Sequence, residues 1–130
     1  YMALCLTHPQ HGYYMTRDPL GAQGDFTTAP EISQIFGELL GAWIATQWQQ
    51  GGAREAVLLE LGPGHGTLMR DMLRATRNVP GFHGALRILL LEASPVLREA
   101  QRSALEGAHP RIAWADALNA LPPLPLYAVA

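Results

Sequence analysis

Apolar residues in the first half of the chain recur at steps of three and four, the spacing of one helix face. The residues with this spacing are Ile32, Ile35, Phe36, Leu39, Leu40, Trp43 and Ile44. Directly upstream, Thr28 and Glu31 stand three residues apart in a capping-box pattern, with Pro30 in the first turn. These features predict an amphipathic helix that begins near Thr28, buries the face just named and ends at the glycine pair of residues 51–52.

Short apolar runs further along the chain have the length and composition of strands, and the first of them suits a strand buried on both faces. They cover residues 56–61, 86–91 and 112–114, and a fourth run begins at residue 126. Between the strands, apolar spacing predicts helices over residues 67–76 and 95–107, the second with Ser94 as its N-cap. Alternating strands and helices are typical of a doubly wound α/β sheet, in which ligands bind beyond the carboxyl ends of the strands.

Composition narrows the class of protein. A chain of 130 residues with 48% hydrophobic content suits one globular domain, and a formal charge of −2 gives no reason to expect a nucleic-acid partner. No run approaches the roughly 18 consecutive apolar residues of a membrane span. Of the five histidines, only His8 and His11 have the paired spacing of metal ligands, and they stand in a proline-glycine segment, so we expect no metal site.

Three glycines follow the first predicted strand at a spacing of two: Gly62, Gly64 and Gly66, with Pro63 between the first pair. Such a turn lets the backbone approach a ligand closely, although it can also merely join a strand to a helix. The dinucleotide fingerprint G-x-G-x-x-G requires a third glycine where Thr67 stands, which disfavours NAD. The acidic Glu60 would repel a pyrophosphate and suits a cationic ligand such as S-adenosylmethionine, which has an ammonium and a sulfonium.

Two further acids follow the next two strands. Glu92 ends the second strand, where carboxylates of nucleotide-binding sheets accept hydrogen bonds from ribose hydroxyls. Asp116 follows the third strand and could accept a hydrogen bond from the exocyclic amine of adenine. Either acid could instead be a solvated surface residue, but acids after three successive strands form one constellation with the glycine turn.

The segment before the predicted helix has two readings. Thr28 and Glu31 are explained by helix capping without any function. Alternatively, Asp25, Phe26 and Thr28 fold over the cofactor and exclude water, because this segment must cross near the carboxyl end of the first strand.

The chain resembles the MidA-like methyltransferases, a family that includes a mitochondrial complex I assembly factor. The resemblance rests on residues 60–69, Glu-Leu-Gly-Pro-Gly-His-Gly-Thr-Leu-Met, on residues 24–34, and on Gly12-Tyr13-Tyr14. It implies a class I methyltransferase fold, which is Rossmann-like, and S-adenosylmethionine as the methyl donor. It carries the cofactor role over to Glu60, the three glycines and Glu92, and less directly to Asp116.

The resemblance also implies an organisation. We expect residues 1–55 to be a loop and helix segment that packs on the core. Residues 56–130 would be the first part of the S-adenosylmethionine-binding core, cut after the start of the fourth strand. The catalytic residues are unknown, and those that hold the acceptor are expected beyond residue 130.

The implied function is methylation of a protein arginine, with a respiratory complex I subunit as one possible substrate. The location would be the cytoplasm in a bacterium or the mitochondrial matrix in a eukaryote. Two alternatives stay open: a non-catalytic assembly factor that retains the fold, and a nucleotide-dependent oxidoreductase. The sequence does not determine the oligomeric state.

Overall fold

The computed structural model describes residue 10 and residues 33–130. The capping pattern at Thr28 lies outside these residues, as does Asp25.

A parallel sheet of four strands forms the centre of the described chain. The strands are β1 (Ala56–Leu61), β2 (Leu86–Leu91), β3 (Ile112–Ala115) and β4 (Leu126–Val129), and their order in the sheet is β3-β2-β1-β4. All three pairings are parallel, which confirms the predicted α/β class. The chain runs outward from β1 to β3 and then returns to the other side of β1. The order of the strands therefore reverses between β1 and β4, the kind of position where such sheets bind ligands.

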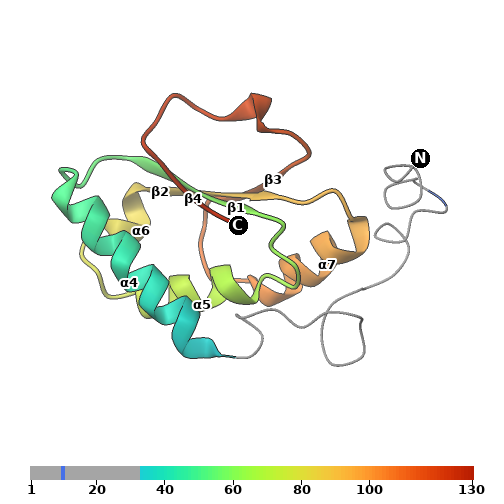
Figure 1. The fold of residues 1–130 in the computed structure, drawn as a ribbon, viewed down its shortest axis with the longest axis horizontal. Coiled ribbons are helices and arrows are strands. Elements are labelled where there is room, and N and C mark those ends of the chain that lie inside the picture. Colours follow the sequence, from blue (N-terminus) through green and yellow to red (C-terminus); the bar gives the residue numbers. More distant parts are fainter. Residues whose placement is uncertain (1–9, 11–32) are drawn as a thin grey trace.

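Helices cover one face of this sheet. They are α4 (Gln34–Gln50), α5 (Thr67–Ala75), α6 (Phe82–Ala85) and α7 (Pro95–Ala104). Over the other face arches the connection from β3 to β4, which contains the short 3-10 helix η1 (Leu118–Ala120) (Figure 1). Within the described part of the chain, no helix is both long and apolar enough to cross a membrane.

The main core lies between the sheet and α4 and α5. Alternate residues of the two central strands point into it, among them Leu58 of β1 and Ile88 and Leu90 of β2. Helix α5 contributes Met69, Met72 and Leu73, which are at most 2% exposed. β1 is also buried on its second face, as its short apolar run predicts.

Helix α4 does not match its prediction. It begins at Gln34, with Ser33 extended as its N-cap, six residues later than expected. Its buried residues are Gly37, Gly41, Ile44, Ala45 and Trp48. Most of the face predicted to be buried is exposed instead, at 46% to 67% for Ile35, Phe36, Leu39 and Trp43.

Close helix packing explains this rotation. A Cβ on Gly41 would lie 2.8 Å from Met72 Cα, and one on Gly37 would lie 2.7 Å from Asp71 Cβ. The two glycines thus let the α4 backbone lie directly against α5, which a face of large apolar side chains would prevent.

The remaining helices agree more closely with their patterns. α5 has the predicted start, and α7 has Pro95 in its first turn while the Ser94 hydroxyl accepts the Leu97 amide at 3.4 Å. α7 ends at Ala104, three residues early, and neither α6 nor η1 was expected.

Candidate cofactor site

Glycine and acid residues gather at the carboxyl edge of the sheet. The last paired residues are Leu61 with Leu91 and Leu91 with Ala115. Pairing continues by one step, because the Gly62 amide donates to Leu91 O at 3.0 Å and the Glu92 amide donates to Ala115 O at 3.3 Å. The chain therefore places Gly62, Glu92 and Asp116 directly after three neighbouring strands, as the sequence predicts.

The glycine turn between β1 and α5 needs its glycines. Gly62, Gly64 and Gly66 have φ values of 62°, 54° and 80°, in the left-handed region that side chains disfavour. The Gly66 amide donates to Pro63 O at 2.8 Å, which closes the turn immediately before α5. No atom lies within 4 Å of a Cβ built on Gly62, so the backbone there is open to a ligand.

Glu60 lies beneath this turn. It shares the core-facing side of β1 with Leu58 and is only 3% exposed. Burial raises the pKa of its carboxyl from 4.5 to about 8, partly opposed by a hydrogen bond from the Met69 amide in the first turn of α5. Its Oε2 is buried without a hydrogen-bond partner. An unpaired buried oxygen is costly, so this atom is suited to accept a donor from a ligand or a bound water.

Both oxygens of the half-buried Glu92 carboxylate are held by the protein. Oε1 accepts the Ser94 amide at 2.8 Å, and Oε2 accepts Gln101 Nε2 at 3.3 Å. Each carboxylate oxygen has two lone pairs, so the oriented carboxylate can still accept hydroxyl donors from a ligand.

Asp116 is 80% exposed and forms an ion pair with Arg98. Arg98 Nε also donates to the backbone oxygen of Glu92 at 2.6 Å. The arginine therefore ties together the ends of β2 and β3. The carboxylate of Asp116 remains accessible at the edge of the sheet, although the Arg98 guanidinium partly neutralises its charge.

Gln101 in α7 was not recognised from the sequence, although it contacts two of the predicted segments. Its Nε2 donates to Gly64 O at 2.7 Å as well as to Glu92. A signal was available: Gln101 stands four residues after Leu97 and four before Leu105, both buried, so it is a polar residue on an apolar helix face.

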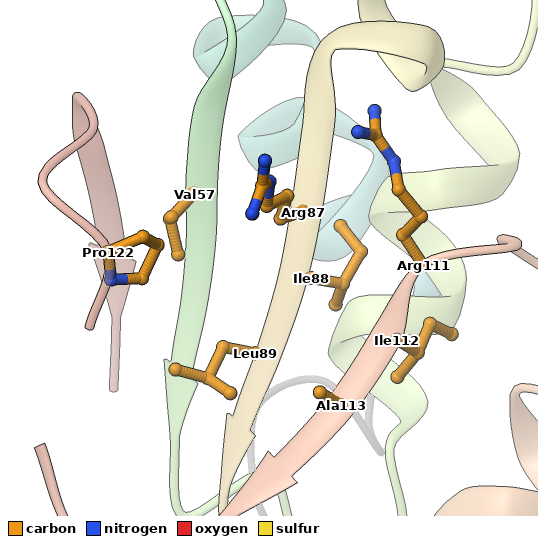
Figure 2. A pocket seen from close by; sticks show the side chains of 8 residues that line it. All are labelled: Val57, Arg87, Ile88, Leu89, Arg111, Ile112, Ala113 and Pro122. Carbon is orange, nitrogen blue, oxygen red and sulfur yellow. The ribbon is translucent and has the colours of Figure 1, made fainter. Parts of the chain in front are cut away.

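A separate cavity of about 450 Å³ lies on the face of the sheet opposite the helices. Its walls include Val57, Arg87, Leu89 and Ala113, from three strands, and Pro122 from the connection between β3 and β4 (Figure 2). Of the predicted site residues that the structure describes, none lines it. In the described residues, no group of three or more His, Cys, Asp or Glu side chains could hold a metal ion.

Residues 39–130 match the family described as "Putative S-adenosyl-L-methionine-dependent methyltransferase". The chain belongs to this methyltransferase family.

Curated relatives of this methyltransferase chain include "Protein arginine methyltransferase NDUFAF7, mitochondrial". The zebrafish (Danio rerio) protein is 49% identical over 82% of the chain, and the human (Homo sapiens) protein is 48% identical over 78%. The chain spans about a quarter of the length of these relatives, 26% and 24% respectively.

A solved structure from Burkholderia thailandensis, bound to S-adenosyl-homocysteine, has a similar fold. It matches with a TM-score of 0.72 and 30% identity, over 98% of this chain and 34% of its own. The family match and this structure confirm the predicted family, the methyltransferase fold and S-adenosylmethionine as the family's cofactor.

The described residues of this methyltransferase chain fit that cofactor. The open backbone at Gly62 offers space, the unpaired Oε2 of Glu60 offers an acceptor, and the carboxylates of Glu92 and Asp116 offer acceptors beside it. The individual roles of these residues, and those of Asp25 and Thr28, remain proposals.

Proposed function

We propose that this chain forms the cofactor-binding part of a protein arginine methyltransferase. The observation that carries the proposal is the alignment of the glycine turn, Glu92 and Asp116 on three adjacent strands, with an unpaired carboxylate oxygen of Glu60 beneath the turn. The names of the relatives support arginine as the methylated residue.

Each residue would hold a different part of S-adenosylmethionine. Glu92 would accept the ribose hydroxyls, since its carboxylate is already oriented by two donors. Asp116 would accept the adenine amine. The backbone at Gly62 and Gly64 would lie along the methionine part, whose ammonium Glu60 would attract. The N-terminus of α5 would favour the methionine carboxylate.

The bound cofactor supplies an activated methyl group on a sulfonium. Transfer of such a group requires mainly that donor and acceptor be held in line, so the residues above contribute orientation. An arginine acceptor remains protonated in water and must lose a proton on methylation, which requires carboxylates on the acceptor side. We expect those carboxylates outside residues 33–130. Asp25 and Thr28 would cover the cofactor and exclude water, and Asp25→Ala should then weaken cofactor affinity and slow turnover.

A subunit of respiratory complex I is the proposed acceptor protein. The names of the relatives support a mitochondrial location. We propose the matrix as the compartment, or the cytoplasm if the source is a bacterium.

The direct test is to incubate the full-length protein with radiolabelled S-adenosylmethionine and purified complex I or a cell lysate. We expect label on an arginine of one protein, identified by mass spectrometry. Glu92→Ala should abolish the labelling, whereas Glu55→Ala, at an exposed ion pair with Arg87, should not.

Other outcomes point to other functions. Cofactor binding without methylation of any protein would favour a non-catalytic assembly factor. Binding of NAD, with no binding of S-adenosylmethionine in calorimetry, would contradict the proposal and favour an oxidoreductase.

A further inference from the structure

Gln101 is a fully buried polar residue in the middle of α7, with 0% exposure. A buried amide is costly unless its donors and acceptor are all paired. A leucine or methionine at this position would continue the apolar face of α7 without that cost. The position therefore calls for an explanation beyond packing.

The side chain of Gln101 joins all three segments of the cofactor site. Its Nε2 donates to Gly64 O at 2.7 Å and to Glu92 Oε2 at 3.3 Å, and its Oε1 accepts the Trp114 indole N–H at 2.8 Å. These partners lie in the turn after β1, directly after β2, and within β3.

Chemistry fixes the orientation of this amide. The indole N–H of Trp114 can only donate, so it requires the amide oxygen. Gly64 O and the Glu92 carboxylate can only accept, so they require the two amide hydrogens. A flipped amide would lose all three bonds, and the indole also packs against the Arg102 guanidinium, which lies 5.1 Å from the ring centroid.

The glycine turn also packs on the backbone of this residue. A Cβ on Gly66 would lie 3.5 Å from both Cα and Cγ of Gln101. A shift of Gln101 would therefore reach the turn through contact as well as through its hydrogen bond to Gly64.

From these contacts we propose that Gln101 is a positioning residue of the cofactor site, which sets the Glu92 carboxylate for the ribose hydroxyls and holds the glycine turn in place. This inference rests on the proposed cofactor site. Without the amide, the Glu92 carboxylate loses one of its two donors and can rotate, and Gly64 O loses its hydrogen bond. The part of the binding energy that depends on the ribose hydroxyls is then reduced.

The test measures affinity in the full-length protein by titration calorimetry. The probes are S-adenosylhomocysteine and its analogue that lacks both ribose hydroxyls. We expect Gln101→Met to weaken S-adenosylhomocysteine roughly tenfold, since one hydrogen bond to a charged group is lost. The affinity for the analogue should fall by less than about threefold. The analogue has no ribose hydroxyls that could donate to the Glu92 carboxylate. A residue with only a structural role would not produce this difference between the two probes.

Thr76→Val is the matched control. Thr76 is also buried and hydrogen-bonded, to Met72 O at 2.8 Å, but it lies after the far end of α5, away from the site. It should lower the free energy of unfolding and leave both affinities unchanged. If Gln101→Met does not fold, Trp114→Phe removes the indole donor, with part of the ring, but keeps the Gln101 side chain, and it should show the same dependence on the ribose hydroxyls.

Two results would overturn the inference: unchanged affinity in a folded Gln101→Met or Trp114→Phe protein, or equal losses for both probes. Failure of the unaltered protein to bind S-adenosylhomocysteine would instead refute the proposed function, so the two failures are distinguishable.

Discussion

At the scale of single residues, Glu60 is a buried acid that costs the fold stability. Its carboxyl is desolvated, has one buried oxygen without a partner, and has a pKa raised to about 8. Nothing in the packing of β1 requires an acid here, because its neighbours on the same face are apolar. Such a costly group is typical of a functional site.

The raised pKa makes stability depend on pH. The folded protein keeps a proton on Glu60 that the unfolded chain releases above its ordinary pKa of 4.5. The free energy of unfolding therefore falls as pH rises from about 4.5 to about 8, by roughly 4 kcal/mol from this group. Glu60→Gln should remove that decline and be the more stable protein at pH 8. Urea unfolding at pH 5 and pH 8 measures this.

Glu55→Gln is the control, because this acid is exposed and ion-paired with Arg87 at 2.9 Å. It should keep the decline of the unaltered protein. Identical pH dependence for Glu60→Gln and the unaltered protein would show that Glu60 is ionised in the folded state throughout.

Cofactor binding should change the protonation of Glu60. A ligand ammonium beside the carboxyl favours its charged form, so binding near pH 7 should release about one proton per site. Calorimetry of S-adenosylhomocysteine in buffers with different ionisation enthalpies counts released protons. The Glu60→Gln protein should release none, and a variant that releases as many protons as the unaltered protein would rule out Glu60 as the source.

At the scale of elements, the packing of α4 on α5 depends on glycines rather than on large apolar residues. Gly41→Ala would place a Cβ 2.8 Å from Met72 Cα and 2.9 Å from Met72 O, and these are backbone atoms that cannot easily move. Alanine favours helix by about 1 kcal/mol over glycine. The clash should outweigh this gain and destabilise the protein by roughly 1 to 3 kcal/mol.

Thermal and urea unfolding measure the effect. Gly84→Ala in α6 is the matched control, because no atom lies within 4 Å of the added Cβ. Equal stability of the Gly41→Ala and Gly84→Ala proteins would contradict close packing of α4 on α5.

The same elements explain what the sequence could predict. β1 and β2 are apolar runs, interrupted only by Glu60 and Arg87, that end at turns, and their bounds were predicted correctly. The prediction of which α4 face is buried was wrong, because periodicity counts only large apolar residues. In the structure the face that contains Gly37 and Gly41 is buried instead. Glu92 was identifiable by its place after a strand. Gln101 was missed because its importance comes from contacts up to 37 residues away along the chain.

At the scale of the whole molecule, the described residues include two regions that could take a small ligand. One is the carboxyl edge with its glycine turn and acids. The other is the cavity on the opposite face of the sheet, whose walls are apolar apart from Arg87 and Arg111 (Figure 2). Only the edge lies at the ends of the strands near the reversal of strand order. Topology and chemistry therefore both favour the edge for a cationic nucleoside.

Ligand-induced stabilisation can decide between these regions. At a concentration one hundred times its Kd, S-adenosylhomocysteine should stabilise the protein by about 2.7 kcal/mol, a rise of several degrees in Tm. Glu92→Ala should remove most of this rise at the same concentration, because the edge loses its oriented carboxylate. Ala113→Leu, which narrows the cavity without touching the edge, should keep the full rise. If the rise in Tm were lost in Ala113→Leu and kept in Glu92→Ala, the ligand would bind in the cavity on the face of the sheet. That result would contradict binding at the carboxyl edge, where the acids follow the three strands.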